Sequence, residues 1–129
     1  MAITPIYAGI LGLFFVFLSI NVIRTRGATG VSLGDGDNEL LARRIRAQGN
    51  CAEYAPIALI LIFFVEQQVA GAAYVHGLNL LLLAGRLAHG FALSSLTPRP
   101  PFRVSGMALT FGAIILSSIT IIGAPFMAA

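Results

Sequence analysis

The chain has 129 residues, of which 57% are hydrophobic and only 10% are charged. A soluble domain carries about one charged residue in four, so this composition excludes an ordinary soluble protein. All the basic residues are arginines, and they cluster at the ends of apolar stretches instead of forming a soluble basic surface, which excludes a nucleic-acid-binding protein. Cys51 is the one cysteine, so the chain has no internal disulfide.

Four apolar stretches predict an all-α integral membrane protein, a bundle of four transmembrane helices that forms a single domain over residues 1–129. Each stretch is close to the roughly 20 residues that a helix needs to cross a bilayer. We expect the spans at about residues 5–23, 39–69, 72–95 and 102–123. No positive side chain precedes the first stretch, and arginines follow it, which is typical of an uncleaved span and not of a signal peptide.

The distribution of arginine predicts the topology. The loop after the second expected span and both ends of the chain carry no arginine, whereas the loops after the first and third spans are flanked by seven: Arg24, Arg26, Arg43, Arg44, Arg46, Arg99 and Arg103. By the positive-inside rule, both arginine-bearing loops face the cytoplasm and both termini lie outside.

Residues 27–38 are rich in glycine, aspartate, serine and threonine, which predicts a loop. Two alternating aspartates in this loop, Asp35 and Asp37, could suggest a calcium loop, but the EF-hand spacing and its distal glutamate are missing, so we expect no metal site. Asp37 or Asn38 is expected to cap the helix that follows.

The second span begins with a run of polar residues. At about 100° per residue, Arg43, Arg46, Asn50, Glu53 and Tyr54 fall within an arc of roughly 100° on one helix face. Arginines beside a membrane often only anchor a helix end, and Arg43 and Arg46 fit that simpler interpretation. Glu53 does not, because it lies past the expected interface, where an ionisable residue is costly. We therefore interpret this face as a polar binding face.

Other polar residues lie deeper in the expected spans. Pro56 is expected to kink the second span, and Glu66 near its end is read as an exposed interfacial group. In the third span, Arg86 and His89 lie one turn apart at a depth close to that of Glu53. We expect a structural Arg86–Glu53 ion pair. His89 fits either a ligand-binding role or a satisfied interior imidazole.

Residues 46–56 match the pattern R-A-x-x-N-x-x-E-x-x-P in full. This block resembles the second-span signature of the MAPEG family, the membrane-associated proteins in eicosanoid and glutathione metabolism. Residues 85–89 and 102–107 are similar to weaker motifs of the third and fourth spans of that family. The chain most resembles a bacterial-type member similar to leukotriene C synthase and microsomal glutathione transferase.

The resemblance implies a homotrimer that binds glutathione, as co-substrate, between neighbouring subunits near the cytoplasmic face. Arg103 matches the family arginine that faces the glutathione sulfur, where a guanidinium lowers the thiol pKa and so supplies the thiolate. The residues expected to contact glutathione are Arg24, Arg26, Arg46, Asn50, Glu53, Tyr54, His89 and Arg99, the last as a fallback for Arg103.

The resemblance predicts a glutathione transferase or peroxidase in the bacterial inner membrane, acting on hydrophobic electrophiles drawn from the bilayer. Two departures weaken it, since Gly49 and Leu93 replace an arginine and a tyrosine found in eicosanoid synthases. The alternative is a non-catalytic protein of the same fold that binds lipid or glutathione. A small drug exporter is excluded because it needs a carboxylate in the first span, which has none.

Overall fold

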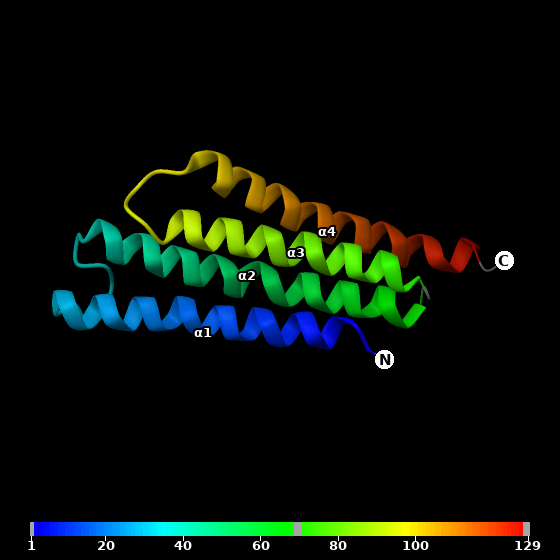
Figure 1. The fold of residues 1–129 in the computed structure, drawn as a ribbon, viewed down its shortest axis with the longest axis horizontal. Coiled ribbons are helices and arrows are strands. Elements are labelled where there is room, and N and C mark those ends of the chain that lie inside the picture. The colour runs from blue at the N-terminus through cyan, green and yellow to red at the C-terminus, as the bar shows by residue number, and fades with distance from the viewer. Residues whose placement is uncertain (1, 69–70, 128–129) are drawn as a thin grey trace.

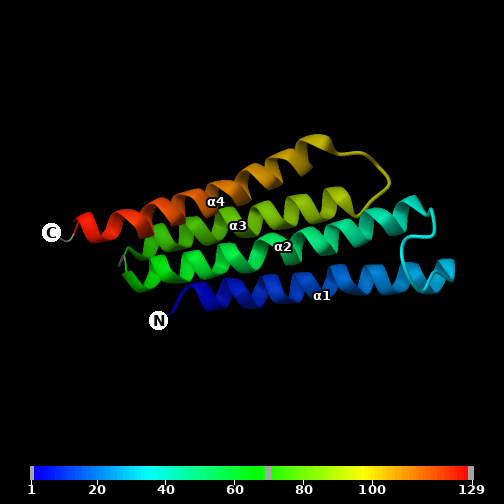
Figure 2. The ribbon, with the colours of Figure 1, turned by 180° about the vertical axis from the view of Figure 1, so that it is seen from behind.

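The computed structural model describes residues 2–68 and 71–127, which form an all-helical bundle. Its helices are α1 (Thr4–Thr29), α2 (Glu39–Gln68), α3 (Ala72–Leu93) and α4 (Pro100–Met127). They lie along one common long axis, with both chain ends at one end of the bundle (Figure 1). The opposite view shows the loops after α1 and α3 together at the other end (Figure 2). The predicted all-α fold is confirmed.

The helix ends differ from the expected spans. α1 continues past residue 23 to Thr29 and ends where Gly30 adopts the left-handed conformation, with φ of 71°, and donates its N–H to the carbonyl of Arg26. α2 runs unbroken through Pro56 to Gln68, and the expected end at residue 69 lies outside the described residues. α4 begins at Pro100, because proline needs no N–H partner in the first turn of a helix.

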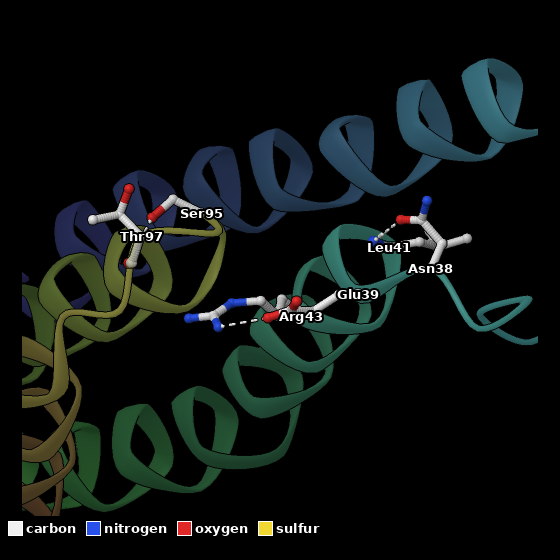
Figure 3. A network of polar contacts seen from close by, with 6 residues as sticks. All are labelled: Asn38, Glu39, Leu41, Arg43, Ser95 and Thr97. Carbon is white, nitrogen blue, oxygen red and sulfur yellow. Dashed lines mark hydrogen bonds and ion pairs between the residues drawn. The ribbon is translucent and has the colours of Figure 1, made fainter.

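The start of α2 is capped as the sequence suggests. Asn38 Oδ1 accepts a hydrogen bond of 2.9 Å from the N–H of Leu41, which would otherwise lack a partner in the first turn (Figure 3). Asp37, the other expected cap, instead has a positive φ of 58° in the preceding turn.

By length and composition, α1, α2 and α4 are the three described helices apolar enough to cross a membrane. The fourth expected span, α3, is less apolar because it carries Asn79, Arg86 and His89. These side chains point into the bundle, where the residues are only 0%, 1% and 4% exposed. The polarity of α3 is therefore hidden by its neighbours, as a membrane-embedded bundle requires.

Apolar side chains form the core at two levels. One cluster, in the half nearer the chain ends, consists of Leu11, Ala58, Ile62, Val65, Val75, Leu78, Leu82 and Ala113. A second, nearer the arginine-rich end, consists of Phe14, Leu18, Ala47, Cys51 and Ala55. Large apolar residues also cover the outside of the bundle, among them Leu13, which is 75% exposed. An outer surface of this kind suits lipid rather than water.

Helices α3 and α4 come into close backbone contact at two glycines. A Cβ atom added to either Gly85 or Gly106 would lie 2.7 Å from the carbonyl oxygen of the other. Small residues permit this backbone-to-backbone contact in membrane helices. The contact brings Arg86, the residue after Gly85, within reach of side chains on α4.

Glu66 is not the exposed interfacial group expected from the sequence. Its carboxylate accepts hydrogen bonds from the backbone N–H groups of Ile3 and Thr4, the second at 2.8 Å. A carboxylate near the first N–H groups of a helix satisfies them and complements the helix dipole. The expectation was wrong because α1 begins beside the end of α2, which the sequence of α2 does not reveal.

Candidate functional site

The polar face of α2 holds an exposed ion pair. Arg46 Nη1 lies 3.5 Å from Glu53 Oε1, two helical turns away, and the two side chains are 61% and 53% exposed. An exposed pair of this kind contributes only about 0–1 kcal/mol to stability. Little stability is therefore lost if this pair separates and each charged group binds an opposite charge of a ligand instead.

Arg86 lies behind this face and is almost fully buried. Its Nη1 donates to Asn50 Oδ1 at 2.7 Å, and its Nε donates to Thr110 Oγ1 at 2.9 Å. Its Nη2 lies 3.3 Å from the sulfur of Met107, and its Cζ lies 5.7 Å from the ring centre of Tyr54. One guanidinium group thus joins α2, α3 and α4 through neutral partners.

The predicted Arg86–Glu53 ion pair was wrong. Asn50, one turn before Glu53, accepts the hydrogen bond from the guanidinium of Arg86. Glu53 instead pairs with Arg46 on the exposed side of α2. Among the described residues, the hydrogen-bond acceptors of Arg86 are an amide, a carbonyl, a hydroxyl and a thioether, with no carboxylate. Several neutral acceptors together satisfy the buried guanidinium, so a carboxylate is not required.

His89 and Arg103 share a recess on the outer side of α4. The recess has a volume of about 360 Å³, and the rest of its wall consists of Val104, Met107, Ala108 and Phe111. The ring centre of Phe111 lies 5.6 Å from that of Tyr54, so the recess adjoins the polar face of α2. Structure and sequence thus bring six of the predicted residues to one region: Arg46, Asn50, Glu53, Tyr54, His89 and Arg103.

Two other arginines are engaged at the ends of the helices. Arg26 Nη1 donates to the carbonyl oxygens of Val31, at 3.3 Å, and Gly34, at 2.8 Å, and so holds the loop after α1. Arg44 Nη1 donates to Thr25 Oγ1 at 2.6 Å. Within the described part of the chain, no hydrogen bond or ion pair joins Arg24 or Arg26 to the Arg46–Glu53 pair.

Arg99, the fallback for Arg103, lines other hollows. It contributes to a pocket of about 100 Å³ with Arg43 and Arg103, and to an apolar groove beside α3, but not to the His89–Arg103 recess. Arg43 pairs with Glu39 at 3.3 Å (Figure 3). Arg103 is therefore the arginine that lines the recess.

The sequence did not single out Thr110 or Met107 as partners of Arg86. The hydroxyl of Thr110 accepts from Arg86 and donates to the carbonyl of Gly106 at 2.9 Å. A usable signal existed, because glycine at 85 and 106 and a hydroxyl one turn after Gly106 predict a close and polar helix crossing.

The fold and the site define a class: an integral membrane bundle of four helices with a buried arginine network and an exposed basic face near one end. The sequence profile of the MAPEG family matches residues 4–123, nearly the whole chain. The chain belongs to the MAPEG family. It is similar to the protein named inner membrane protein YecN in two strains of Escherichia coli, K12 and O6:H1 (CFT073). Each is 37% identical over 114 residues, covering 88% of this chain and 86% of the relative.

Proposed function

We propose that this protein is a membrane-bound glutathione transferase or peroxidase that acts on apolar electrophiles or lipid hydroperoxides. The observation that carries the proposal is the exposed Arg46–Glu53 pair beside the recess lined by His89 and Arg103. Glutathione has two carboxylates, an ammonium group and a thiol, and this region offers a partner for each kind of group.

The polar face of α2 matches the ends of the tripeptide. The Arg46 guanidinium can bind a carboxylate with two parallel hydrogen bonds, and the Glu53 carboxylate can bind the ammonium group. Arg86 holds the Asn50 side chain by its oxygen, which leaves the amide nitrogen to donate to the peptide. Tyr54, between Arg86 and Phe111, closes the side of the face toward the recess.

Arg103 supplies the chemistry of the proposed reaction. A guanidinium beside the glutathione thiol favours loss of its proton to solvent and stabilises the thiolate. The thiolate sulfur then attacks an electrophilic carbon, a carbon–sulfur bond forms, and the leaving group departs with the bonding electrons. With a hydroperoxide, the sulfur attacks the terminal oxygen and becomes a sulfenic acid, while the O–O bond breaks and the alkoxide leaves and takes up a proton to become the alcohol. A second glutathione thiol then attacks the sulfenic sulfur, water leaves, and the disulfide forms.

The same proposal includes a homotrimer in a bacterial inner membrane, with the arginine-rich end toward the cytoplasm. The name of the Escherichia coli relative supports the membrane, and the clustering of arginine supports the orientation. Arg24 and Arg26 would then reach glutathione from a neighbouring subunit. The proposal rests on the family for the number of subunits.

A second candidate is a non-catalytic protein of the same fold that binds glutathione or lipid. Leu93 favours it, because this residue stands where a synthase tyrosine would lie and packs partly buried against the apolar cluster of Phe14 and Leu18. No phenol assists the thiol at this position, so Arg103 has to act without one.

The test separates binding from thiolate formation. Glutathione binding is measured by calorimetry, and thiolate by its ultraviolet difference spectrum, on detergent-purified wild type, Arg46→Ala and Arg103→Ala. We expect wild type to bind and to form thiolate, Arg46→Ala to bind poorly, and Arg103→Ala to bind without thiolate. Binding without thiolate in wild type would reject the enzyme in favour of the second candidate. Absence of binding in wild type would reject both the glutathione-dependent enzyme and the non-catalytic glutathione-binding protein.

A further inference from the structure

A second basic pocket lies at the arginine-rich end, on the side of α3 and the loop that follows it. Its volume is about 100 Å³, and its wall consists of Arg43, Ala92, Pro98, Arg99, Pro100 and Arg103. Three guanidinium groups from two helices and a loop thus meet around one small space, and no carboxylate lines it. Glu39 pairs with Arg43 but is 72% exposed and lies outside the pocket.

Arg43 has a donor without an acceptor at this place. Its Nε is buried, and the described residues provide no hydrogen-bond partner for it, although the whole side chain is 21% exposed. Its guanidinium extends from α2 in the direction of the loop that carries Ser95 and Thr97 (Figure 3). An unsatisfied donor on a charged group is costly, so the Arg43 guanidinium is incompletely paired, and an anion in the pocket would add acceptors for its accessible N–H groups.

The pocket continues into an apolar groove. The groove has a volume of about 390 Å³ and shares Ala92 and Arg99 with the pocket; the rest of its wall consists of Leu87, Ala88, Phe91 and Phe102. Phe91 and Phe102 are 54% and 58% exposed. From Ala92 to Leu87, the groove follows α3 away from the arginine-rich end and toward the apolar middle of the bundle.

We propose that the pocket and the groove together form a binding site for one anionic phospholipid. The phosphate lies between Arg43 and Arg99, whose planar guanidinium groups suit phosphate oxygens. One acyl chain follows the groove along Phe91 and Leu87. A free phosphate would leave the groove unused, and a zwitterionic headgroup would bring its own cation toward three arginines. The combination of a basic pocket and an apolar groove at the membrane interface therefore selects an anionic lipid.

The chain contains no tryptophan, so a single one can serve as a local reporter. Phe102→Trp places it in the groove. Ile23→Trp places a matched control on α1, beside Arg24 at the same end of the bundle, where residue 23 is 66% exposed. Both proteins are reconstituted in phosphatidylcholine vesicles that contain a minor fraction of brominated phosphatidylglycerol or of brominated phosphatidylcholine, and quenching of fluorescence is measured.

For Phe102→Trp we expect several-fold stronger quenching by brominated phosphatidylglycerol than by brominated phosphatidylcholine. Adding Arg43→Gln and Arg99→Gln together should abolish this preference, because each arginine contributes up to about fivefold to the attraction for an anionic lipid. Quenching by brominated phosphatidylcholine should stay constant, which shows that the variant is still folded and inserted. Arg103 is left unchanged because it also lines the recess of the proposed reaction.

Three results would overturn the proposal. Equal quenching by the two lipids at Phe102→Trp would show that no anionic lipid is selected. The same preference at Ile23→Trp would show a general attraction of the arginine-rich end for anionic lipid instead of a site. Loss of the preference on adding inorganic phosphate, at constant ionic strength, would show that the pocket binds a free anion.

Discussion

Two arginines of neighbouring helices, Arg86 and Arg46, illustrate opposite uses of the same side chain. Arg86 is 1% exposed and donates to Asn50, Thr110 and Met107, which together occupy all three of its nitrogens. The Arg46 side chain is 61% exposed, and Glu53, at 3.5 Å, is its one ion-pair partner among the described residues. The first arginine is committed to the fold, and the second is available to a ligand.

The difference teaches how a polar site is built in a membrane bundle. The buried guanidinium fixes Asn50 and lies over the ring of Tyr54, both of which belong to the same helix face as Arg46. The inner layer of this site, Arg86 and Asn50, is thus fixed by hydrogen bonds. It orients an outer layer, Arg46 and Glu53, whose charges can bind other partners. Substitutions in the inner layer should therefore lower stability, whereas those in the outer layer should lower binding.

The largest effect on stability should come from Arg86→Met. Methionine fills similar space but donates nothing, so Asn50 Oδ1 and Thr110 Oγ1 lose a charged donor in the bundle interior. We expect the free energy of unfolding to fall by at least about 3 kcal/mol. Reversible unfolding of the detergent-solubilised protein, followed by far-ultraviolet circular dichroism, measures the change. A loss below about 0.5 kcal/mol would contradict the structural role of Arg86.

A smaller loss is expected when the helix crossing that supports Arg86 is disturbed. Gly106→Ala places a methyl group 2.7 Å from the carbonyl of Gly85, and backbone cannot yield as a flexible side chain can. We expect about 1–3 kcal/mol of destabilisation. Gly112→Ala on the same helix is the control, because its Cβ would have no neighbour within 4 Å. Equal stability of the two variants would show that the crossing can relax.

The sequence predicted the helices because their apolar runs and arginine-rich ends follow directly from the cost of placing charge in lipid. It also placed Arg46, Asn50, Glu53 and Tyr54 on one face, because helical spacing is fixed by geometry. The exposed pair itself, Arg46 with Glu53, was not foreseen. A helical wheel shows which residues share a face but not how far each extends from it.

Contacts between helices were the part that the sequence could not supply. The partner of Arg86 depends on the relative heights of α2, α3 and α4, and a shift of one turn exchanges Glu53 for Asn50. The use of Glu66 likewise depends on where α1 begins beside α2. Both wrong predictions, the Arg86–Glu53 pair and an exposed Glu66, were based only on the expected depth of the charge in the membrane. In the bundle, each charge instead binds the neutral groups that lie nearest to it.

Two carboxylates of α2, Glu66 and Glu53, should differ in the same way as Arg86 and Arg46. Glu66→Gln removes the charge from the start of α1 and weakens its contacts with the N–H groups of Ile3 and Thr4, which should cost about 1 kcal/mol. Glu53→Gln should change stability by less than about 0.5 kcal/mol, because the side chain is exposed. Unfolding curves of both variants give the comparison. The reverse order would mean that Glu53, and not Glu66, supports the fold.

A small effect on stability should accompany the largest effect on binding. Arg46→Gln removes half of an exposed pair, so the free energy of unfolding should change by less than about 1 kcal/mol. If the outer layer binds glutathione, the same change removes a charged hydrogen-bond donor to a carboxylate and should weaken the affinity at least about tenfold, measured by calorimetry. Arg24→Gln gives a second test by the same affinity measurement, because in the proposed trimer this variant removes a guanidinium that a neighbouring subunit supplies to glutathione. Unchanged affinity in Arg46→Gln would show that the exposed pair is only a surface contact and does not bind glutathione. The role of Arg86 in the fold would be unaffected by that result.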